Sequence, residues 1–299
     1  MGRIQLSWLR IMRLFFSSHV KQAVFLLLLL LFVFRAPLLM KHFTKGFHLA
    51  RFESILHSSD IERLSISVDP ADEKEALAIL AQPFTYLDRG AQCYVFESQD
   101  QKYVMKIFQE NRCATSLSRW KKKAKEKKET RKHTDFRSCL IAYTLAKNET
   151  ALVYLHLLPT QNLLPKLSVR SPLGQWYRLP LDRYCFVIQK KVKPFQETLF
   201  QASLEGNLPV YLSSFLSLLD SRLAKGIRNE DRSLSSNFGF LDQKAVEIDF
   251  GRYWQSESFL QSDLQKIEKK IFVDQLREFI EKQLPHEMET LEKSLLQAE

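Results

Sequence analysis

Three side chains in this sequence are of types that together bind phosphate groups and a divalent cation. Lys106 follows Val104 and Met105 in an apolar segment, and its ammonium group can pair with phosphate oxygens. Asp249 begins an Asp-Phe-Gly turn and Asn237 precedes it, so a carboxylate and an amide oxygen are available for a hard cation such as Mg²⁺. The sequence therefore predicts phosphate and metal chemistry if the fold brings these residues together.

A strand must hold Lys106 if its ammonium group is to be fixed in place. Residues 84–96 are rich in aromatic and β-branched side chains, and residues 102–108 have the same character after the polar residues 97–100. This pattern predicts two strands joined by a short hairpin, with Lys106 on the second. A further hairpin is predicted for residues 166–181, because a Pro-Leu-Gly turn separates two strand-like runs.

Later segments show mainly helical periodicity. Residues 136–157 are apolar with helical spacing and are expected to pack on the sheet, and a compact strand is expected at residues 184–188. Residues 208–226 repeat leucine and phenylalanine at helical period, and residues 264–284 keep one apolar face until Pro285 interrupts it. Strands come early and helices late, so we predict an α+β fold with two lobes.

The predicted elements follow a recognisable order along the chain. A strand with a glycine turn is followed by a lysine strand, a helix, a further strand, a second helix, an asparagine and an Asp-Phe-Gly turn. The segments that carry this order are residues 87–96, 104–108 and 237–251. Together they resemble the protein-kinase-like superfamily over about residues 83–255. The resemblance implies a two-lobed protein-kinase-like fold that binds ATP with Mg²⁺ and transfers a phosphoryl group.

The resemblance also implies roles for individual residues. Gly90 and Lys106 would lie at the phosphates of the nucleotide, and Gln189 would lie in the hinge segment that meets adenine. Asn237 and Asp249 would bind the metal ion, and Asp249 would also belong to the catalytic set.

The predicted catalytic loop departs from the family pattern. The family has a His-x-Asp sequence with an asparagine five residues after the aspartate. Here Asp231 lies six residues before Asn237, and the loop before Asp231 contains no histidine. Asp231 is the candidate base that would accept the proton of an acceptor hydroxyl. The acidic partner expected for Lys106 is left open between Glu126 and Glu129.

The glycine turn departs from the family pattern as well. Gly90 stands alone, with Asp88 and Cys93 where flanking glycines are expected, and a carboxylate at Asp88 would repel phosphate. No Ala-Pro-Glu sequence follows the Asp-Phe-Gly turn at residues 249–251. Two functions are therefore kept: a phosphotransferase acting on a small molecule, glycan or lipid, similar to small bacterial kinases, or a pseudokinase that binds or scaffolds without turnover.

The N-terminus predicts a membrane anchor. Residues 23–34 form an uninterrupted apolar run between Lys21 and Arg35, and continuing to Met40 brings its length close to the roughly 20 residues that span a bilayer. Residues 3–16 have the pattern of a basic amphipathic helix suited to a membrane surface. We expect one uncleaved anchor, with the folded domain in the cytoplasm where ATP is found. A cleaved signal peptide or a buried core helix are the alternatives.

Charge and cysteine usage restrict the partners. The net charge of +10 favours phosphate-bearing ligands or acidic lipid. The basic residues 116–134 predict either a solvated helix face or contact with membrane or phosphate, which keeps a membrane-anchored interaction protein as a third function. Trp120 is the only aromatic residue of that segment, so we expect no nucleic-acid partner. The four cysteines lack C-x-x-C spacing, which argues against a zinc site.

The pattern as a whole predicts four regions and leaves the oligomeric state open. These are an anchor at residues 1–40, a polar connector at 41–82, an N-lobe with a nucleotide-binding sheet at 83–192, and a reduced helical C-lobe with the catalytic loop and Asp-Phe-Gly turn at 193–299.

Overall fold

The computed structural model describes most of the chain, namely residues 18–49, 52, 66–90, 92–109 and 136–297. The predicted amphipathic helix at residues 3–16, the basic segment at 116–134 and the candidate partners Glu126 and Glu129 lie outside the described residues.

A seven-stranded sheet carries Lys106 near its centre, with the strand order β4-β7-β3-β2-β1-β5-β6. Neighbouring strands are antiparallel, except that β1 and β5 run parallel. In chain order the strands are β1 (Phe84–Arg89), β2 (Cys93–Ser98), β3 (Tyr103–Phe108), β4 (Leu152–His156), β5 (Lys166–Arg170), β6 (Trp176–Pro180) and β7 (Phe186–Lys190).

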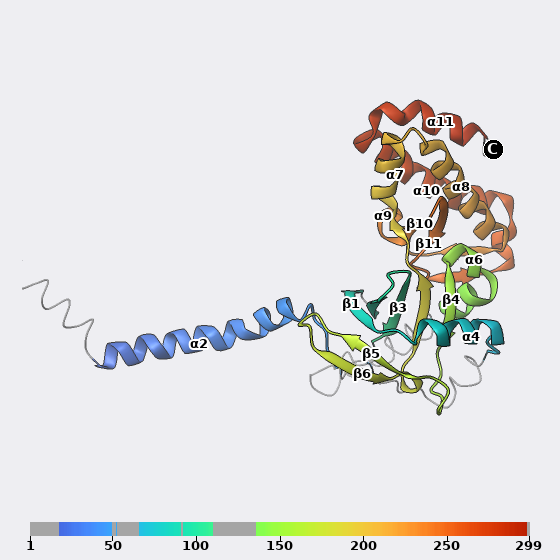
Figure 1. The fold of residues 1–299 in the computed structure, drawn as a ribbon. Helices are drawn as coiled ribbons and strands as arrows, with labels where there is room; N and C mark the ends of the chain where they lie inside the picture. The colour runs from blue at the N-terminus through green and yellow to red at the C-terminus, as the bar shows by residue number, and fades with distance from the viewer. Residues whose placement is uncertain (1–17, 50–51, 53–65, 91, 110–135, 298–299) are drawn as a thin grey trace, which may run out of the picture.

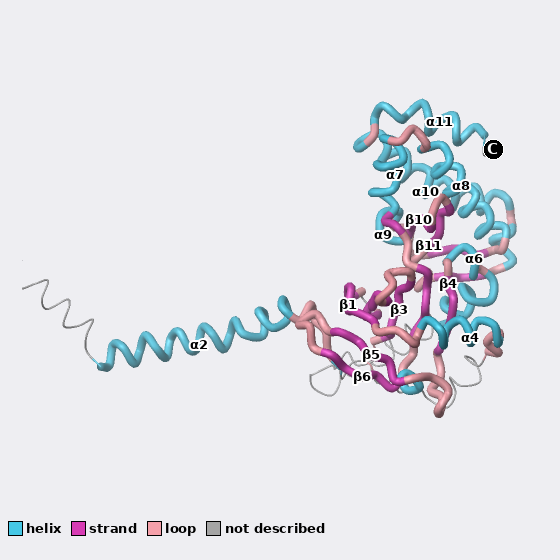
Figure 2. The backbone as a smooth tube through the Cα atoms, viewed as in Figure 1, coloured by secondary structure: helices cyan, strands magenta, loops and turns pink. Residues whose placement is uncertain are grey.

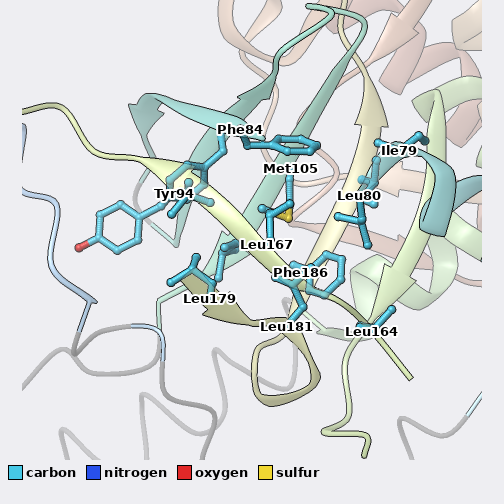
Figure 3. Packing of buried hydrophobic residues seen from close by; sticks show 14 of the residues in the cluster. Ile79, Leu80, Phe84, Tyr94, Met105, Leu164, Leu167, Leu179, Leu181 and Phe186 are labelled. Atoms are coloured by element: carbon cyan, nitrogen blue, oxygen red, sulfur yellow. The ribbon is translucent and has the colours of Figure 1, made fainter. Parts of the chain in front are cut away.

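Alternation along these strands builds the core on one face of the sheet. Phe84, Met105 and Phe186 come from three different strands, and each is fully buried in the same apolar cluster (Figure 3). Helix α4 (Pro70–Ile79) covers this cluster with Ile79, and Asp69 caps its first turn by accepting a hydrogen bond from the Ala71 amide. The sheet is thereby rigid where Lys106 leaves it.

Two sequence predictions are corrected here. Residues 84–96 are not one strand, because the chain turns between β1 and β2 around Gly90. Residues 136–157 are not one helix either: residues 136–145 are helical, α6 (Lys147–Thr150) is a single turn, and β4 follows. The helix fails because Ala151 takes a left-handed backbone conformation, with φ of 52°, which ends the turn.

The second half of the chain is mainly helical, as predicted, and lies beside the large sheet (Figures 1 and 2). Its helices are α7 (Phe195–Leu204), α8 (Leu208–Ala224), α9 (Leu234–Asn237), α10 (Ser262–Gln283) and α11 (Met288–Gln297), with short 3₁₀ turns at Leu181–Arg183, Glu257–Leu260 and Pro285–Glu287. Its strands are β8 (Lys193–Pro194), β9 (Ile227–Asn229), β10 (Phe238–Leu241), β11 (Lys244–Glu247) and β12 (Tyr253–Gln255).

These short strands form two small sheets, and the candidate residues flank them: Asp231 follows β9, Asn237 precedes β10 and Asp249 follows β11. One has the order β11-β10-β8 and the other pairs β12 with β9. Leucine and phenylalanine side chains of α8 and α10 pack under them, including Leu212, Phe215 and Phe272, all fully buried. The apolar period expected at residues 208–226 therefore faces the core. The period expected at residues 264–284 does so only in its later part, because Leu264 and Ile267 are exposed.

Helix α2 (Ser18–Phe43) projects away from the rest of the described chain (Figure 1). Its stretch Gln22–Met40 has a mean hydropathy of 2.6 and is the one helix of the described residues long and apolar enough to cross a membrane. None of this stretch is buried against the remainder of the protein.

The residues that follow α2 contact the sheet. The Tyr94 hydroxyl donates to the Gly46 carbonyl at 2.9 Å, and the Tyr86 hydroxyl donates to the Lys45 carbonyl at 3.1 Å. Phe47 joins the apolar cluster of the sheet, where its exposed fraction is 8%. Although the sequence predicts a polar connector from residue 41, its described first part is thus anchored in the core.

Candidate functional site

Lys106 reaches from the large sheet to the Asp-Phe-Gly turn. Its strand neighbours are Val95 on β2 and Val187 on β7, so its backbone is fixed on both sides. The Lys106 ammonium donates to the Ile248 carbonyl at 2.5 Å and lies 5.8 Å from the centre of the Phe250 ring. Two residues that are 142 positions apart in the sequence are therefore in direct contact.

Asp249 presents its carboxylate to solvent beside this contact. Its Oδ1 accepts a hydrogen bond from the Gly251 amide at 3.1 Å, which orients the carboxylate across the turn. Phe250 is buried in a cluster with Phe136 and Tyr253, so the next side chain anchors the turn. The Asp249 side chain is exposed, which leaves carboxylate oxygens accessible to a ligand.

Asn237 links the catalytic-loop candidate to the Asp-Phe-Gly turn. Its backbone carbonyl accepts from the amides of Ile248 at 2.6 Å and Asp249 at 3.4 Å. Its side-chain Nδ2 donates to the Asp231 carbonyl at 2.9 Å, and its Oδ1 accepts from the Ser236 hydroxyl at 2.8 Å. An amide oxygen has two lone pairs, so Oδ1 retains capacity for one further partner.

Asp231 lies in the loop that Asn237 closes. Its amide donates to the Asn229 side-chain oxygen at 2.9 Å, and its Oδ1 accepts from the Ser233 amide at 3.4 Å. The side chain is half-buried. The six-residue spacing to Asn237 is accommodated by the single turn α9, whose last residue is Asn237 itself.

Asn229 is a positioning residue that the sequence reasoning missed. It is fully buried, and its Nδ2 donates both to Glu247 Oε1 at 2.7 Å and to the Asp249 carbonyl at 2.9 Å. Together with its bond from the Asp231 amide, it joins the two candidate catalytic segments. It stands two residues before Asp231, where the His-x-Asp pattern has histidine, and that spacing could have revealed it.

A buried network of charged and polar side chains holds the strand that leads to Asp249. Arg222 Nη1 donates to both oxygens of Glu247 at 2.9 Å, and both side chains are fully buried. The Tyr253 hydroxyl donates to Glu247 Oε2 at 2.7 Å. Burial, followed by the neighbouring Glu247 carboxylate, raises the pKa of Tyr253 well above its usual value. Because β11 ends at Glu247, this network fixes the strand that leads to Asp249.

The turn between β1 and β2 approaches the Asp-Phe-Gly turn. A Cβ added to Gly251 would lie 3.0 Å from Gln92 Oε1 and 3.3 Å from Asp249 Oδ1, so Gln92 borders the site. Gly90 is exposed, and its amide donates to the Cys93 carbonyl at 2.9 Å. A Cβ on Gly90 would meet nothing closer than 3.7 Å, so the space at this turn does not require glycine.

Gln189 lies inside the large sheet, between Val104 of β3 and Leu152 of β4. Its side chain is 1% exposed and its Nε2 donates to the Thr150 carbonyl at 2.9 Å. The side chain therefore faces the interior, and a base-binding contact would have to come from the segment after β7. The structure thus gives the Gln189 side chain a packing role, and the hinge role expected for its segment stays a prediction.

The segment after β7 runs closely over β10. A Cβ added to Gly239 would lie 2.4 Å from Val192 Cγ2 and 2.6 Å from the Lys193 carbonyl oxygen. Residue 239 must therefore be glycine for the two parts of the fold to meet at this distance. The glycine of the Asn-Phe-Gly-Phe sequence thus has a packing role beside the metal-site candidate Asn237.

The donor set for a metal ion is small and mixed. Within the described part of the chain, no group of three or more His, Cys, Asp and Glu side chains gathers to hold a metal. Asn237 and Asp249 supply an amide and a carboxylate oxygen from adjacent, hydrogen-bonded segments. Such a pair fits Mg²⁺ that takes its remaining ligands from phosphate and water.

Lys106 has no carboxylate partner among the described residues, where its ammonium contacts a carbonyl and an aromatic ring. Glu126 and Glu129, the candidates from the sequence, lie outside that part of the chain. The identity of its acidic partner stays a prediction.

Comparison with known proteins gives a faint structural likeness. No family model matches the chain, and no curated protein matches its sequence. A high-resolution crystal structure of WbdD is 16% identical, with a TM-score of 0.39, and the match covers 65% of this chain and 38% of that chain. The co-crystal structure of WbdD with the kinase inhibitor LY294002 is 14% identical, with a TM-score of 0.36, covering 64% of this chain and 37% of that one.

A third similar structure is described as the bifunctional kinase-methyltransferase WbdD. It is 16% identical, with a TM-score of 0.32, and the match covers 56% of this chain and 31% of that chain. The matched region thus spans well under half of the WbdD chain. A likeness at these scores does not establish a function for this chain.

Proposed function

We propose that the protein binds ATP with Mg²⁺ and transfers the terminal phosphoryl group to a hydroxyl of a small molecule, glycan or lipid at a membrane. One observation carries the proposal: the Lys106 ammonium contacts the Asp-Phe-Gly segment at Ile248, and Asn237 ties that segment to Asp231. These contacts support the proposal because they join the segments that carry the cation, the two oxygen ligands and the candidate base. Phosphoryl transfer needs this set and little else from a protein.

Lys106 is assigned to the phosphates of the nucleotide. Its ammonium has three donors, and the contact with the Ile248 carbonyl uses one of them. The other two are available for phosphate oxygens. The Ile248 contact also fixes the end of the long side chain, which reduces the entropy lost when a ligand binds.

Asn237 and Asp249 are assigned to the metal ion. Bound Mg²⁺ would neutralise charge on the phosphate oxygens as the transferred group leaves. The residues themselves supply position: the Asn229 side chain and the Asn237 backbone hold the Asp249 backbone from two sides, so its carboxylate stays at the edge of the site.

Asp231 is assigned as the base. Its carboxylate would accept the proton of the acceptor hydroxyl while that oxygen bonds to the γ-phosphorus, and the bond from the γ-phosphorus to the bridging oxygen breaks to release ADP. The Ser233 and Asn229 hydrogen bonds hold the loop in place for this step.

Helix α2 favours an acceptor found at a membrane. Residues 45–47, just after its end at Phe43, contact the sheet, so the folded domain stays within a short distance of the bilayer if α2 spans it. This proposal includes a domain on the cytoplasmic side, where ATP is present.

A pseudokinase is the second candidate, and a specific observation favours it. Asp88 is exposed at the end of β1, next to the turn expected to cover phosphates, and it adds negative charge there. Nucleotide would then bind weakly and no transfer would follow.

Measurement of phosphoryl transfer separates the two candidates. Full-length protein in detergent is given γ-labelled ATP, Mg²⁺ and membrane glycolipid extract, and labelled product or phosphate is followed. Asp231→Asn should retain nucleotide binding and lose about 10²- to 10⁴-fold in turnover, the usual contribution of a general base.

Glu230→Gln is the matched control for this test, because Glu230 is an exposed neighbouring carboxylate. If Glu230→Gln were the damaging change, the base assignment would be wrong. If wild type bound nucleotide without any turnover, the pseudokinase would replace the phosphotransferase.

A further inference from the structure

The outer face of the β5–β6 hairpin carries positive charge and a large aromatic ring. Arg170 stands opposite Trp176 in the strand register, and Ser168 stands opposite Arg178. Trp176 has an exposed fraction of 58%. Residues 166–180 contain three basic residues and no acidic one, so this face attracts anions without internal compensation.

The turn of the hairpin adds an apolar tip. Leu173, between the two strands, has an exposed fraction of 52%. The Arg170 guanidinium lies over this turn, since a Cβ added to Gly174 would be 3.5 Å from Arg170 Nη2. An exposed leucine therefore lies at the tip, and Trp176 and Arg170 lie opposite each other at the strand pair next to it.

This end of the hairpin lies beside the C-terminal end of α2 (Figure 2). Tyr177, next to Trp176, faces the other way and contacts Phe47, with 6.1 Å between ring centroids. Phe47 comes four residues after Phe43, the last residue of α2. Four residues span at most about 14 Å, so the hairpin is tied close to the point where α2 meets the sheet.

We infer that the outer face of this hairpin docks on the anionic surface of the bilayer that α2 enters. Leu173 inserts below the headgroups, Trp176 lies at their level, and Arg170 and Arg178 pair with acidic lipid phosphates. Tryptophan is enriched at this depth of membranes, and basic side chains near an anionic leaflet attract it. Docking fixes the orientation of the folded domain on the membrane. The inference rests on membrane insertion of α2 and not on catalysis.

Quenching of tryptophan fluorescence by brominated lipid tests the inference. Full-length protein is reconstituted in vesicles of brominated phosphatidylcholine, with or without phosphatidylglycerol. The emission of Trp176 is obtained as the difference between wild type and Trp176→Phe. We expect marked loss of this emission in anionic vesicles and less loss in neutral ones.

Trp254→Phe is the matched control, because Trp254 is 42% exposed but lies on β12, away from the hairpin. Its emission should be quenched little in either vesicle. Arg170→Ala should lower the ratio of docked to undocked domain about fivefold, the effect of one basic residue near an anionic surface. Lys266→Ala on α10 should leave the ratio unchanged.

Three results would overturn the inference. If the emission of Trp176 is quenched no more than that of Trp254 in anionic vesicles, the hairpin does not reach the bilayer. If the quenching of Trp176 changes neither with lipid charge nor with Arg170→Ala, acidic lipid is not the partner of the hairpin. Protein that fails to sediment with vesicles removes the basis of the inference as well. None of these outcomes depends on nucleotide, so they are separate from failure of the phosphotransferase proposal.

Discussion

Replacement of Asn229 by alanine tests the buried connection beneath the site. The change removes three hydrogen bonds, to Glu247 Oε1, the Asp249 carbonyl and the Asp231 amide, with lengths of 2.7, 2.9 and 2.9 Å. The bond to the ionised Glu247 contributes about 1.5–3 kcal/mol and each of the others about 1 kcal/mol. We therefore expect a loss of about 3–5 kcal/mol in the free energy of unfolding.

Thermal unfolding in detergent is the assay. In domains of 150–250 residues, each kcal/mol shifts the midpoint by about 2–4 °C, so the expected loss corresponds to roughly 6–20 °C. Asn148→Ala is the control, because Asn148 is exposed on α6 and its loss should change stability by under about 0.5 kcal/mol. A shift for Asn229→Ala as small as that of Asn148→Ala would refute the reasoning, since the three bonds would then contribute nothing.

Two further predictions follow from packing and from a buried acid. Gly239→Ala should destabilise the fold strongly, because the added Cβ would lie 2.4 Å from Val192 Cγ2. Gly90→Ala is the control and should be tolerated. Denaturant midpoints measure both, and equal effects of the two changes would contradict this prediction. Burial raises the pKa of Glu149, but the hydrogen bonds from Lys225 and Ser221 outweigh it and hold that pKa below its usual value. A depressed folded-state pKa means stability that is present at neutral pH and lost as pH falls through about 4.5 and below. Glu149→Gln should therefore unfold more easily than wild type at pH 7, with the difference shrinking in acid; a difference independent of pH would count against this.

Local pattern was enough to predict the elements with one clear face. The hairpin at residues 166–181 formed because its turn has proline and glycine flanked by alternating residues, and β5 and β6 flank that turn. Helix α8 was predicted from its apolar residues at helical period, and one face of the helix is buried. The strand that carries Lys106 was also found from its composition.

Prediction failed where both faces of an element are buried. All five residues of β4 are buried, so the run shows no period of two and was assigned to a helix with residues 136–145. The role of Phe47 was missed because its partners, Tyr86, Tyr94 and Tyr177, are distant in sequence. Polar character around Phe47 suggested a connector, and only tertiary contact shows that it belongs to the core.

The candidate site divides in the same way. The sequence pointed to Lys106 and Asp249, and their segments do meet in the structure. Asn229 was not predicted: its place two residues before Asp231 was the only signal in the sequence, and its buried partners Glu247 and Asp249 become known only from the structure. The hinge role of Gln189 stays a prediction; only the end of the preceding strand was wrong, since the strand runs to Lys190 and not to Ile188.

Binding of Mg-ATP to Asp249→Asn tests the central claim most directly. Full-length wild type, Asp249→Asn and the control Asp242→Asn are compared by thermal unfolding with ATP, with and without Mg²⁺. Asp242 is also an exposed carboxylate in a turn, and it has a left-handed backbone that asparagine tolerates. At about 100 times the dissociation constant, ligand should stabilise wild type and Asp242→Asn by roughly 2.7 kcal/mol, and Asp249→Asn should lose the part that depends on Mg²⁺. Equal stabilisation of all three proteins, or none in wild type with any nucleotide, would contradict the account.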